Sequence, residues 1–224
     1  VGQLNVNAGT NNARQLFGQI AGINIWENDG AGLSLNIGSR GLSPHRSSNF
    51  NMRQNGYDMA ADALGYPESY YTPPVEAIDR IEIVRGAASL QYGTQFGGLV
   101  NFDLKQAPKD TRLQWAGNIS RGSWNFRSFF NSVGGSLAKG KLSYFAYHKY
   151  AASDGQRPNA GFHQHHAHGG IGWQPSRRLT IRAEYTHMNY LAQQPGGLTD
   201  AEFAEDPLQS KRARNWFAVN WNLA

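Results

Sequence analysis

The chain has 224 residues, a formal net charge of +5 and no cysteine. The lack of cysteine excludes disulfides, thiolate metal sites and cysteine nucleophiles. Its 21 basic residues are scattered, whereas a nucleic-acid-binding domain concentrates them on one face, so no nucleic acid is expected as a partner. Charged residues make up 17% of the chain, aromatic residues 12%, and glycine occurs 26 times. This composition favours strands joined by tight turns over a helical bundle.

The first half of the chain predicts short elements that glycine and proline interrupt. Apolar residues at helical spacing indicate a short helix over 13–20, which Gly22 ends. Asn55-Gly56 is a strong tight-turn signal, and Pro73-Pro74 favours one helical turn over 75–78. Short strands are expected at 23–26, 33–37, 50–53, 80–84 and 99–104.

The second half begins near Ala107-Pro108-Lys109-Asp110 and predicts six antiparallel strands of about ten residues each. Apolar and polar residues alternate along these strands, which predicts one apolar and one polar face. The residues expected on the apolar face are Leu113, Trp115, Ile119, Trp124, Phe126, Phe130, Leu179, Ile181, Ala183, Tyr185, Phe217, Val219, Trp221 and Leu223.

Linker lengths and aromatic positions favour a membrane barrel over a soluble sandwich. The sequence lacks the long apolar run that a spanning helix needs, but a spanning barrel does not need one. Aromatic residues recur at strand ends, as in an interfacial girdle. Short linkers at 120–123, 137–141 and 174–178 alternate with long ones at 151–162 and 191–215. Six strands cannot close around a polar lumen, so we expect a fragment of a barrel.

The stretch "IDRIEIVRGAASLQYGTQFGGLVNF", residues 78–102, resembles the C-terminal part of the plug domain of TonB-dependent outer-membrane transporters. Upstream, "ENDGAGLSLNIGSRGLSPHRSSNFN" is most similar to the ferric dicitrate receptor subfamily. The resemblance is strong in the first half of the chain and only general in the second. It implies an α+β plug domain over 1–109, followed over 110–224 by antiparallel transmembrane β-barrel strands of an incomplete barrel.

The resemblance also implies roles for residues of the plug. Arg40 and Arg85, each before a glycine, are expected to meet acids on the barrel wall and lock the plug in place, because an unpaired buried charge is costly. Glu82 is a local alternative partner for Arg85. Asn55 stands where the family has an acid, and asparagine tolerates the left-handed turn. The glycines expected to shape the backbone are Gly86, Gly93, Gly97 and Gly98.

Two loops, 42–48 and 63–71, correspond by resemblance to the plug apices that face outward and touch the substrate. Their cations, hydroxyls and rings suit an anionic hydroxycarboxylate chelate of iron(III). The expected substrate-binding residues are Ser43, His45, Arg46, Tyr66 and Tyr70.

The segment "GFHQHHAHGG" holds the densest histidine cluster. On a barrel strand, alternation directs His166 and His168 to the lumen and His163 and His165 outward. No metal site is expected, because no local cysteine or carboxylate completes a shell, and His166 and His168 are the candidates if one exists. The acids in 200–206 lack the spacing of a calcium loop. No nucleophile elbow is present, so no enzyme activity is expected.

The sequence therefore predicts TonB-dependent uptake of a ferric citrate-like chelate across the bacterial outer membrane. The expected partners are the TonB–ExbB–ExbD energy complex, outer-membrane lipid and lipopolysaccharide, and the iron(III) chelate is cargo, with no resident cofactor. One alternative is a transporter for another siderophore, haem or zinc, which the histidines would serve. An alternative of another class is a soluble β-sandwich domain for binding or adhesion.

Overall fold

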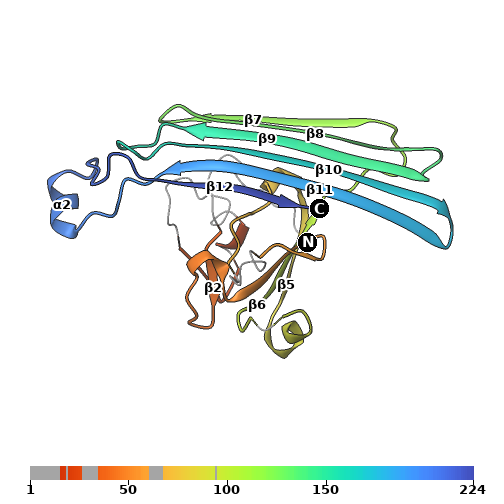
Figure 1. The fold of residues 1–224 in the computed structure, drawn as a ribbon, viewed down its shortest axis with the longest axis horizontal. Helices are drawn as coiled ribbons and strands as arrows, with labels where there is room; N and C mark the ends of the chain where they lie inside the picture. Colours follow the sequence, from red (N-terminus) through yellow and green to blue (C-terminus); the bar gives the residue numbers. More distant parts are fainter. Residues whose placement is uncertain (1–15, 19, 27–34, 61–67, 94) are drawn as a thin grey trace. The chain divides into compact units, whose positions relative to one another are not determined.

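The computed structural model describes residues 16–18, 20–26, 35–60, 68–93 and 95–224. The chain forms two compact units, Val1–Gln106 and Ala107–Ala224 (Figure 1). The division lies at the change of sequence character and close to the expected domain boundary after residue 109. Within the described ranges, no helix is long and apolar enough to cross a membrane.

The described residues of the first unit form two small sheets and short 3-10 helices. One sheet pairs β1 with β2 antiparallel, and the other has the order β4-β3-β6-β5, in which β3 and β6 are parallel. The strands are β1 (Ile23–Ile25), β2 (Ile37–Ser39), β3 (Phe50–Gln54), β4 (Tyr57–Asp58), β5 (Ile78–Val84) and β6 (Gly98–Leu104). The 3-10 helices are η1 (His45–Ser47), η3 (Val75–Ala77) and η4 (Gly86–Gln91).

Most of the elements predicted for this unit are confirmed. The expected helical turn after Pro73-Pro74 is η3, and β3, β5 and β6 lie where strands were predicted. Leu16 and Phe17 are helical, while the start of that helix, 13–15, lies outside the described residues. The strand predicted at 33–37 is wrong in its bounds, because the described strand β2 begins only at Ile37, where pairing with Ile25 starts.

Aromatic and aliphatic side chains form the core of the first unit. Phe17 packs edge-to-face on Phe102, with ring centroids 6.2 Å apart, and both side chains are fully buried. Phe50 and Val100, on the parallel strands β3 and β6, are buried as well. Each such side chain contributes about 1.5–3 kcal/mol through burial. The helical residues 16–17 are therefore held to the sheet by packing.

The tight turn predicted at Asn55-Gly56 is confirmed. Asn55 and Gly56 have φ of 51° and 86°, the left-handed pair that joins two antiparallel strands, here β3 and β4. The Asn55 side-chain oxygen also accepts a hydrogen bond from the backbone amide of Leu104 at 2.9 Å, and the backbone amide of Asn55 donates to the carbonyl of Phe102 at 2.9 Å. Asparagine therefore both tolerates the turn and fastens it to β6.

Glycine is required where β6 begins. Gly98 has φ of 124°, and a Cβ there would lie 2.5 Å from the carbonyl oxygen of Val84. A Cβ on Gly97 would lie 2.5 Å from the carbonyl oxygen of Asn49. Backbone therefore approaches backbone at this point, which only glycine permits.

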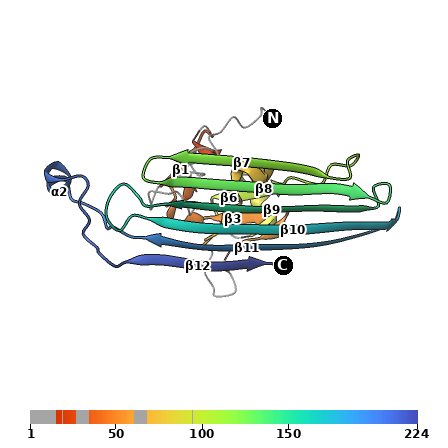
Figure 2. The ribbon, with the colours of Figure 1, turned by 90° about the horizontal axis from the view of Figure 1, so that it is seen from above.

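The second unit is one antiparallel sheet whose strands neighbour each other in chain order, β7 to β12 (Figure 2). The strands are β7 (Gln114–Gly122), β8 (Phe126–Leu137), β9 (Leu142–Ser153), β10 (Phe162–Ser176), β11 (Leu179–Gln193) and β12 (Trp216–Leu223). A short helix, α2 (Asp200–Glu205), lies in the connection between β11 and β12. This is the up-and-down arrangement that the sequence predicts.

One face of the sheet is apolar and exposed, as predicted from β7 and β11. The register joins Trp115 on β7 through each intervening strand to Tyr185 on β11, so the two side chains share a face with Ile181. Trp115 is 68% exposed and Ile181 is 47% exposed. Large apolar side chains in such a contiguous exposed set indicate contact with lipid or another apolar surface.

The faces predicted for β8 and β12 are wrong. Phe130 lies opposite Asn118, and Leu223 lies opposite Thr186, so Phe126, Phe130 and the Phe217–Leu223 series lie on the face predicted to be polar. Phe129 and Val133 instead share the exposed face with Trp115 and Ile119. Alternation within a strand fixes two faces but does not identify them, because a one-residue change in register exchanges them.

The connections differ in length between the two ends of the sheet. Turns 138–141 and 177–178 lie at one end, and connections 123–125, 154–161 and 194–215 lie at the other. The short turn expected at 120–123 is wrong, because β7 continues to Gly122 and the turn follows it. This turn lies at the end with the long loops, so short turns occur at both ends.

Gly98 offers a test of the packing at the start of β6. We expect Gly98→Ala to lower the local opening free energy of β5 and β6 by about 1–3 kcal/mol, since it combines a left-handed φ with a backbone clash. Hydrogen exchange of peptides from these strands measures this. Gly56→Ala is the control, because φ there is 86° but no atom lies within 4 Å of the added Cβ. Equal losses in the two variants would contradict the clash.

Candidate functional site

The loop that follows β2 is held by a buried serine. Ser47, in η1, donates its hydroxyl hydrogen to the carbonyl of Leu35 at 2.8 Å and accepts from the amide of Ile37 at 3.1 Å. The amide of Arg46 donates to the side chain of Asn36 at 2.8 Å. Arg46 and Ser47 have φ of 47° and 53°. These hydrogen bonds hold both residues in left-handed backbone conformations, which are unfavourable for residues other than glycine unless the surrounding structure stabilises them.

A second segment, 68–71, is fastened beside this loop. The amide of Ser69 donates to the carbonyl of Arg46 at 3.0 Å, and the Ser69 hydroxyl donates to the carbonyl of Tyr71 at 3.0 Å. The buried Tyr71 hydroxyl donates to the side chain of Gln54 on β3 at 2.7 Å. Glu68 and Tyr70, which alternate with the buried Ser69 and Tyr71, therefore lie next to Arg46.

Arg46, Glu68 and Tyr70 form a hydrogen-bonded cluster. The Arg46 Nη1 donates to Glu68 Oε2 at 2.8 Å and to the Tyr70 hydroxyl at 3.1 Å, and that hydroxyl donates to Glu68. The guanidinium also lies 5.2 Å from the centre of the Tyr70 ring. We call these three residues the Arg46 cluster.

The charges in the Arg46 cluster stabilise each other. The hydrogen bond to Glu68 raises the pKa of Arg46. Partial burial alone would raise the pKa of Glu68, but hydrogen bonds from Tyr70 and Arg46 outweigh it and lower this pKa. Burial and the bond to Glu68 raise the pKa of Tyr70. At neutral pH the cluster thus holds a guanidinium, a carboxylate and a neutral phenol.

Of the predicted substrate-binding residues, the structure brings Arg46 and Tyr70 together. Ser43 and His45 are exposed on the same loop, where the amide of His45 donates to the Ser43 hydroxyl at 3.3 Å. Tyr66 lies outside the described residues. Glu68 was missed by the sequence analysis, although it is the single acid in the predicted apex 63–71.

The arginine-glycine pair 40–41 lies in a turn, and the pair 85–86 lies at the start of the 3-10 helix η4. Arg40 has φ of 55° and Gly41 76°, and the guanidinium of Arg40 lies 3.4 Å from the position of a Cβ on Gly86. Arg85, which precedes Gly86, donates to the carbonyl of Ala21 at 2.9 Å. Both arginines are exposed, and neither forms an ion pair with another described residue.

The local partner considered for Arg85 is wrong. Glu82 pairs with Arg80 at 2.9 Å, and Arg80 also contacts Asp103 at 2.6 Å. Residues 80 and 82 lie on the same side of strand β5, whereas 82 and 85 are an odd number apart. The strand period therefore directs Glu82 away from Arg85.

The histidines of β10 divide between the two faces as the alternation predicts. His163 and His165 share the face of Tyr150, and His166 and His168 share the face of Lys149. His168 hydrogen-bonds the hydroxyl of Thr186 at 2.8 Å, and His166 the side chain of Gln164 at 3.0 Å. The described residues contain no group of three histidines or acids that could hold a metal ion.

Residues 3–99 match the family model described as "TonB-dependent Receptor Plug Domain". A stretch of 53 residues is 42% identical to the "Iron-regulated outer membrane virulence protein" of Vibrio cholerae serotype O1, and covers 23% of this chain and 8% of that protein. The family-model match lies within the first unit, where the sequence resemblance is strongest.

Solved structures match both units. The unliganded ferric citrate transporter FecA matches with a TM-score of 0.74 and 24% identity, over 88% of this chain and 31% of that one. The pyoverdine outer membrane receptor FpvA of Pseudomonas aeruginosa matches with a TM-score of 0.61 and 19% identity, over 76% and 24%. The siderophore receptor PirA of the same species gives 0.55 and 24%, over 70% and 28%.

The first unit is therefore a TonB-dependent receptor plug domain. The second unit has the fold of part of the barrel of the solved outer-membrane receptors, and the chain spans less than a third of the length of those it matches. The soluble sandwich is thereby excluded as a fold. The matches are to receptors and transporters and not to enzymes.

The lowered pKa of Glu68 makes the Arg46 cluster sensitive to acid. Because the folded pKa lies below the ordinary value of 4.5, the stabilisation is fully present above pH 4.5 and is lost as pH falls through the lowered pKa. We expect radical oxidation of Tyr70 to rise in that range. Glu68→Gln removes the titrating group, so its Tyr70 oxidation should not change with pH. An acid-induced rise of equal size in this variant would contradict the assignment.

Proposed function

We propose that the protein carrying this chain takes up a ferric chelate across the outer membrane, with a citrate-like hydroxycarboxylate as the preferred chelator. The observation that supports this most is the Arg46 cluster in a plug domain. It combines a guanidinium, a phenol and an exposed loop with a histidine and a serine, which are groups that bind carboxylate and hydroxyl oxygens.

The relatives support iron uptake in general more than citrate in particular. They include a ferric citrate transporter, a pyoverdine receptor, a siderophore receptor and an iron-regulated outer membrane protein. The citrate-like cargo is more specific than what the relatives support, and the argument for it comes from the residues of this chain. Another ferric siderophore is the alternative that these neighbours favour.

Glu68 competes with an incoming anion for the guanidinium of Arg46. The ion pair is partly exposed, with 34% of the Arg46 side chain and 17% of the Glu68 side chain accessible. Such a pair contributes about 1 kcal/mol or less, because water and salt screen it. A multivalent anion can therefore replace Glu68 at the guanidinium. Binding at this loop would then release a carboxylate that was held within the plug.

Release of Glu68 suggests how binding is passed to the rest of the plug. Ser69 joins the segment of Glu68 to the backbone of Arg46, and Tyr71 joins it to Gln54 on β3. A change at the Arg46 cluster would thus reach the four-stranded sheet through short, buried contacts. We propose that the TonB–ExbB–ExbD complex recognises this change in the plug and supplies the force that moves the plug.

We retain the proposal that Arg40 and Arg85 lock the plug against acids of the barrel wall. In support, both arginines are exposed, and each precedes a glycine with a positive φ. An exposed guanidinium is free to form two parallel hydrogen bonds to a carboxylate. Such a lock would hold the plug until TonB-dependent force acts on it.

Substitutions in the Arg46 cluster test the proposal in the full-length receptor. We expect Arg46→Gln to weaken binding of ferric citrate by about tenfold or more, since a charge-assisted hydrogen bond is lost. We expect Glu68→Gln to tighten binding by about threefold, because the internal competitor for the guanidinium is removed. Titration calorimetry with ferric citrate measures both.

The matched control is Asp79→Asn, which removes an exposed carboxylate from the same unit. It should leave the affinity for ferric citrate unchanged. Parallel assays of cellular uptake with labelled ferric citrate, a ferric siderophore, haem and zinc identify the cargo. Uptake of another compound but not of ferric citrate would overturn the citrate-like proposal. If that compound is a ferric siderophore, the proposal of iron-chelate transport still holds.

A further inference from the structure

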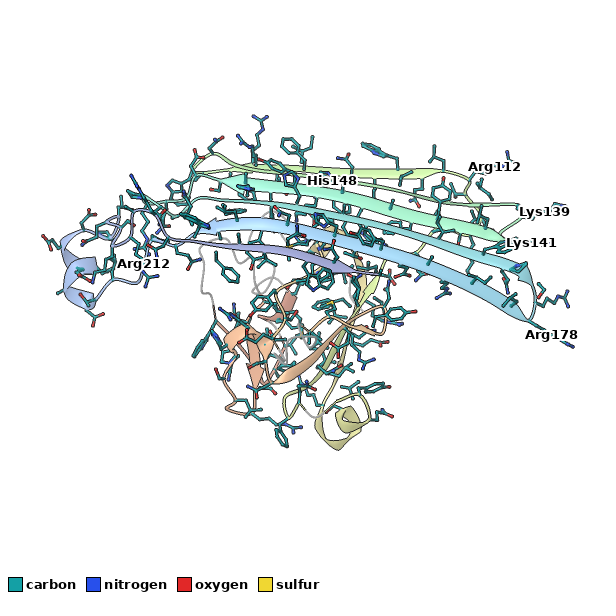
Figure 3. The ribbon with its side chains drawn as sticks, in the orientation of Figure 1. Arg112, Lys139, Lys141, His148, Arg178 and Arg212 are labelled. Carbon is teal, nitrogen blue, oxygen red and sulfur yellow. The ribbon has the colours of Figure 1, made fainter. Side chains whose placement is uncertain are left out.

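Five basic side chains gather at the end of the sheet where the turns 138–141 and 177–178 lie. They are Arg112, Lys139, Lys141, Arg177 and Arg178, and we call them the basic rim. All five are exposed. Figure 3 shows Arg112, Lys139, Lys141 and Arg178 at this end of the sheet and Arg212 at the other.

Strand pairing brings the members of the basic rim together. Leu142, next to Lys141, is the partner of Trp173 across β9 and β10, and the amide of Gln174 donates to the carbonyl of Lys141 at 2.7 Å. The carbonyl of Arg112 accepts from the Tyr144 hydroxyl on β9 at 2.8 Å. The rim therefore runs continuously across the ends of five neighbouring strands.

The basic rim is not neutralised within the described chain. None of its five side chains forms an ion pair with another described residue. Lys109 and Asp110, which precede Arg112, cancel each other in charge. At the opposite end of the sheet, by contrast, Lys211 pairs with Glu202 at 2.5 Å. Several like charges that share one edge create a positive potential that attracts anions.

An apolar surface begins directly beside the basic rim. Leu179 follows Arg178, Leu113 follows Arg112, and Trp173 lies on β10 near the 177–178 turn, and all three side chains are exposed. Trp173 lies opposite Ile181, so this apolar surface continues along the face that carries Trp115. A row of cations followed by exposed aromatic and aliphatic side chains matches a molecule with an anionic head and apolar tails.

We propose that the basic rim binds the phosphate headgroups of anionic phospholipid in the periplasmic leaflet of the outer membrane. In bacterial barrels the longer loops face outward and the end with only short turns faces the periplasm, and the long connections 154–161 and 194–215 both lie at the end opposite 138–141 and 177–178. An acidic soluble partner or free phosphate would use the cations but would leave the adjoining apolar face unused. The proposal rests on the outer-membrane placement of the sheet and not on the identity of the chelate.

Native mass spectrometry of the full-length receptor tests this with phosphatidylglycerol as the probe. Phosphatidylcholine with the same acyl chains controls for headgroup charge. In the double variants Lys139→Gln/Lys141→Gln and Arg177→Gln/Arg178→Gln, we expect phosphatidylglycerol binding to weaken by about 30-fold. The charge-matched control is Arg212→Gln/Arg214→Gln, whose exposed arginines lie in the connection between β11 and β12. It should leave phosphatidylglycerol binding unchanged.

Salt provides a second measurement on the unsubstituted receptor. Phosphatidylglycerol binding should weaken as salt rises, whereas phosphatidylcholine binding should not, because salt screens only the charge contribution. Equal binding of the two lipids, equal losses in rim and control variants, or displacement by inorganic phosphate at equal concentration would overturn the proposal. Ferric citrate affinity should be the same in the rim variants, so failure here leaves the transport proposal untouched.

Discussion

The register of the six-stranded sheet is the constraint on which the second unit depends. Each backbone bond between neighbouring strands fixes which residues lie side by side, and therefore which side chains share a face. Trp115, Ile181 and Tyr185 come from strands far apart in sequence, yet the ladder places them on one exposed surface. In a bilayer such a ladder must continue around a closed barrel, because unpaired amides at a sheet edge are not tolerated in lipid.

In the plug, hydrogen bonds to a few buried polar groups determine which side chains lie together. Ser47 and Ser69 are buried and connect segments that are distant in sequence, so they decide where Arg46 and Glu68 meet. The result is a cation that already has an anionic partner. This differs from the simple cationic apex that the sequence suggests, and it makes anion binding an exchange of partners.

Several local features could be predicted from the sequence, whereas contacts between distant segments could not. Asn55-Gly56 and the turn at Val75–Ala77 follow from backbone preferences of adjacent residues, which a sequence displays directly. The pairing of Arg46 with Glu68 spans 22 positions, and the face of β12 depends on its register with β11. Neither is encoded within one segment. The lock expected of Arg40 and Arg85 follows from the family resemblance and not from their spacing, and it stays a prediction.

The most direct test of the account is the depth of single tryptophans in the full-length receptor, reconstituted in vesicles with brominated acyl chains. Receptors that retain only Trp115 or only Trp173 should be strongly quenched, because the register puts both on the exposed apolar face. A receptor that retains only Trp221 should be protected, because that side chain lies on the opposite face with Met188. Quenching of Trp221 with protection of Trp115 would contradict the account.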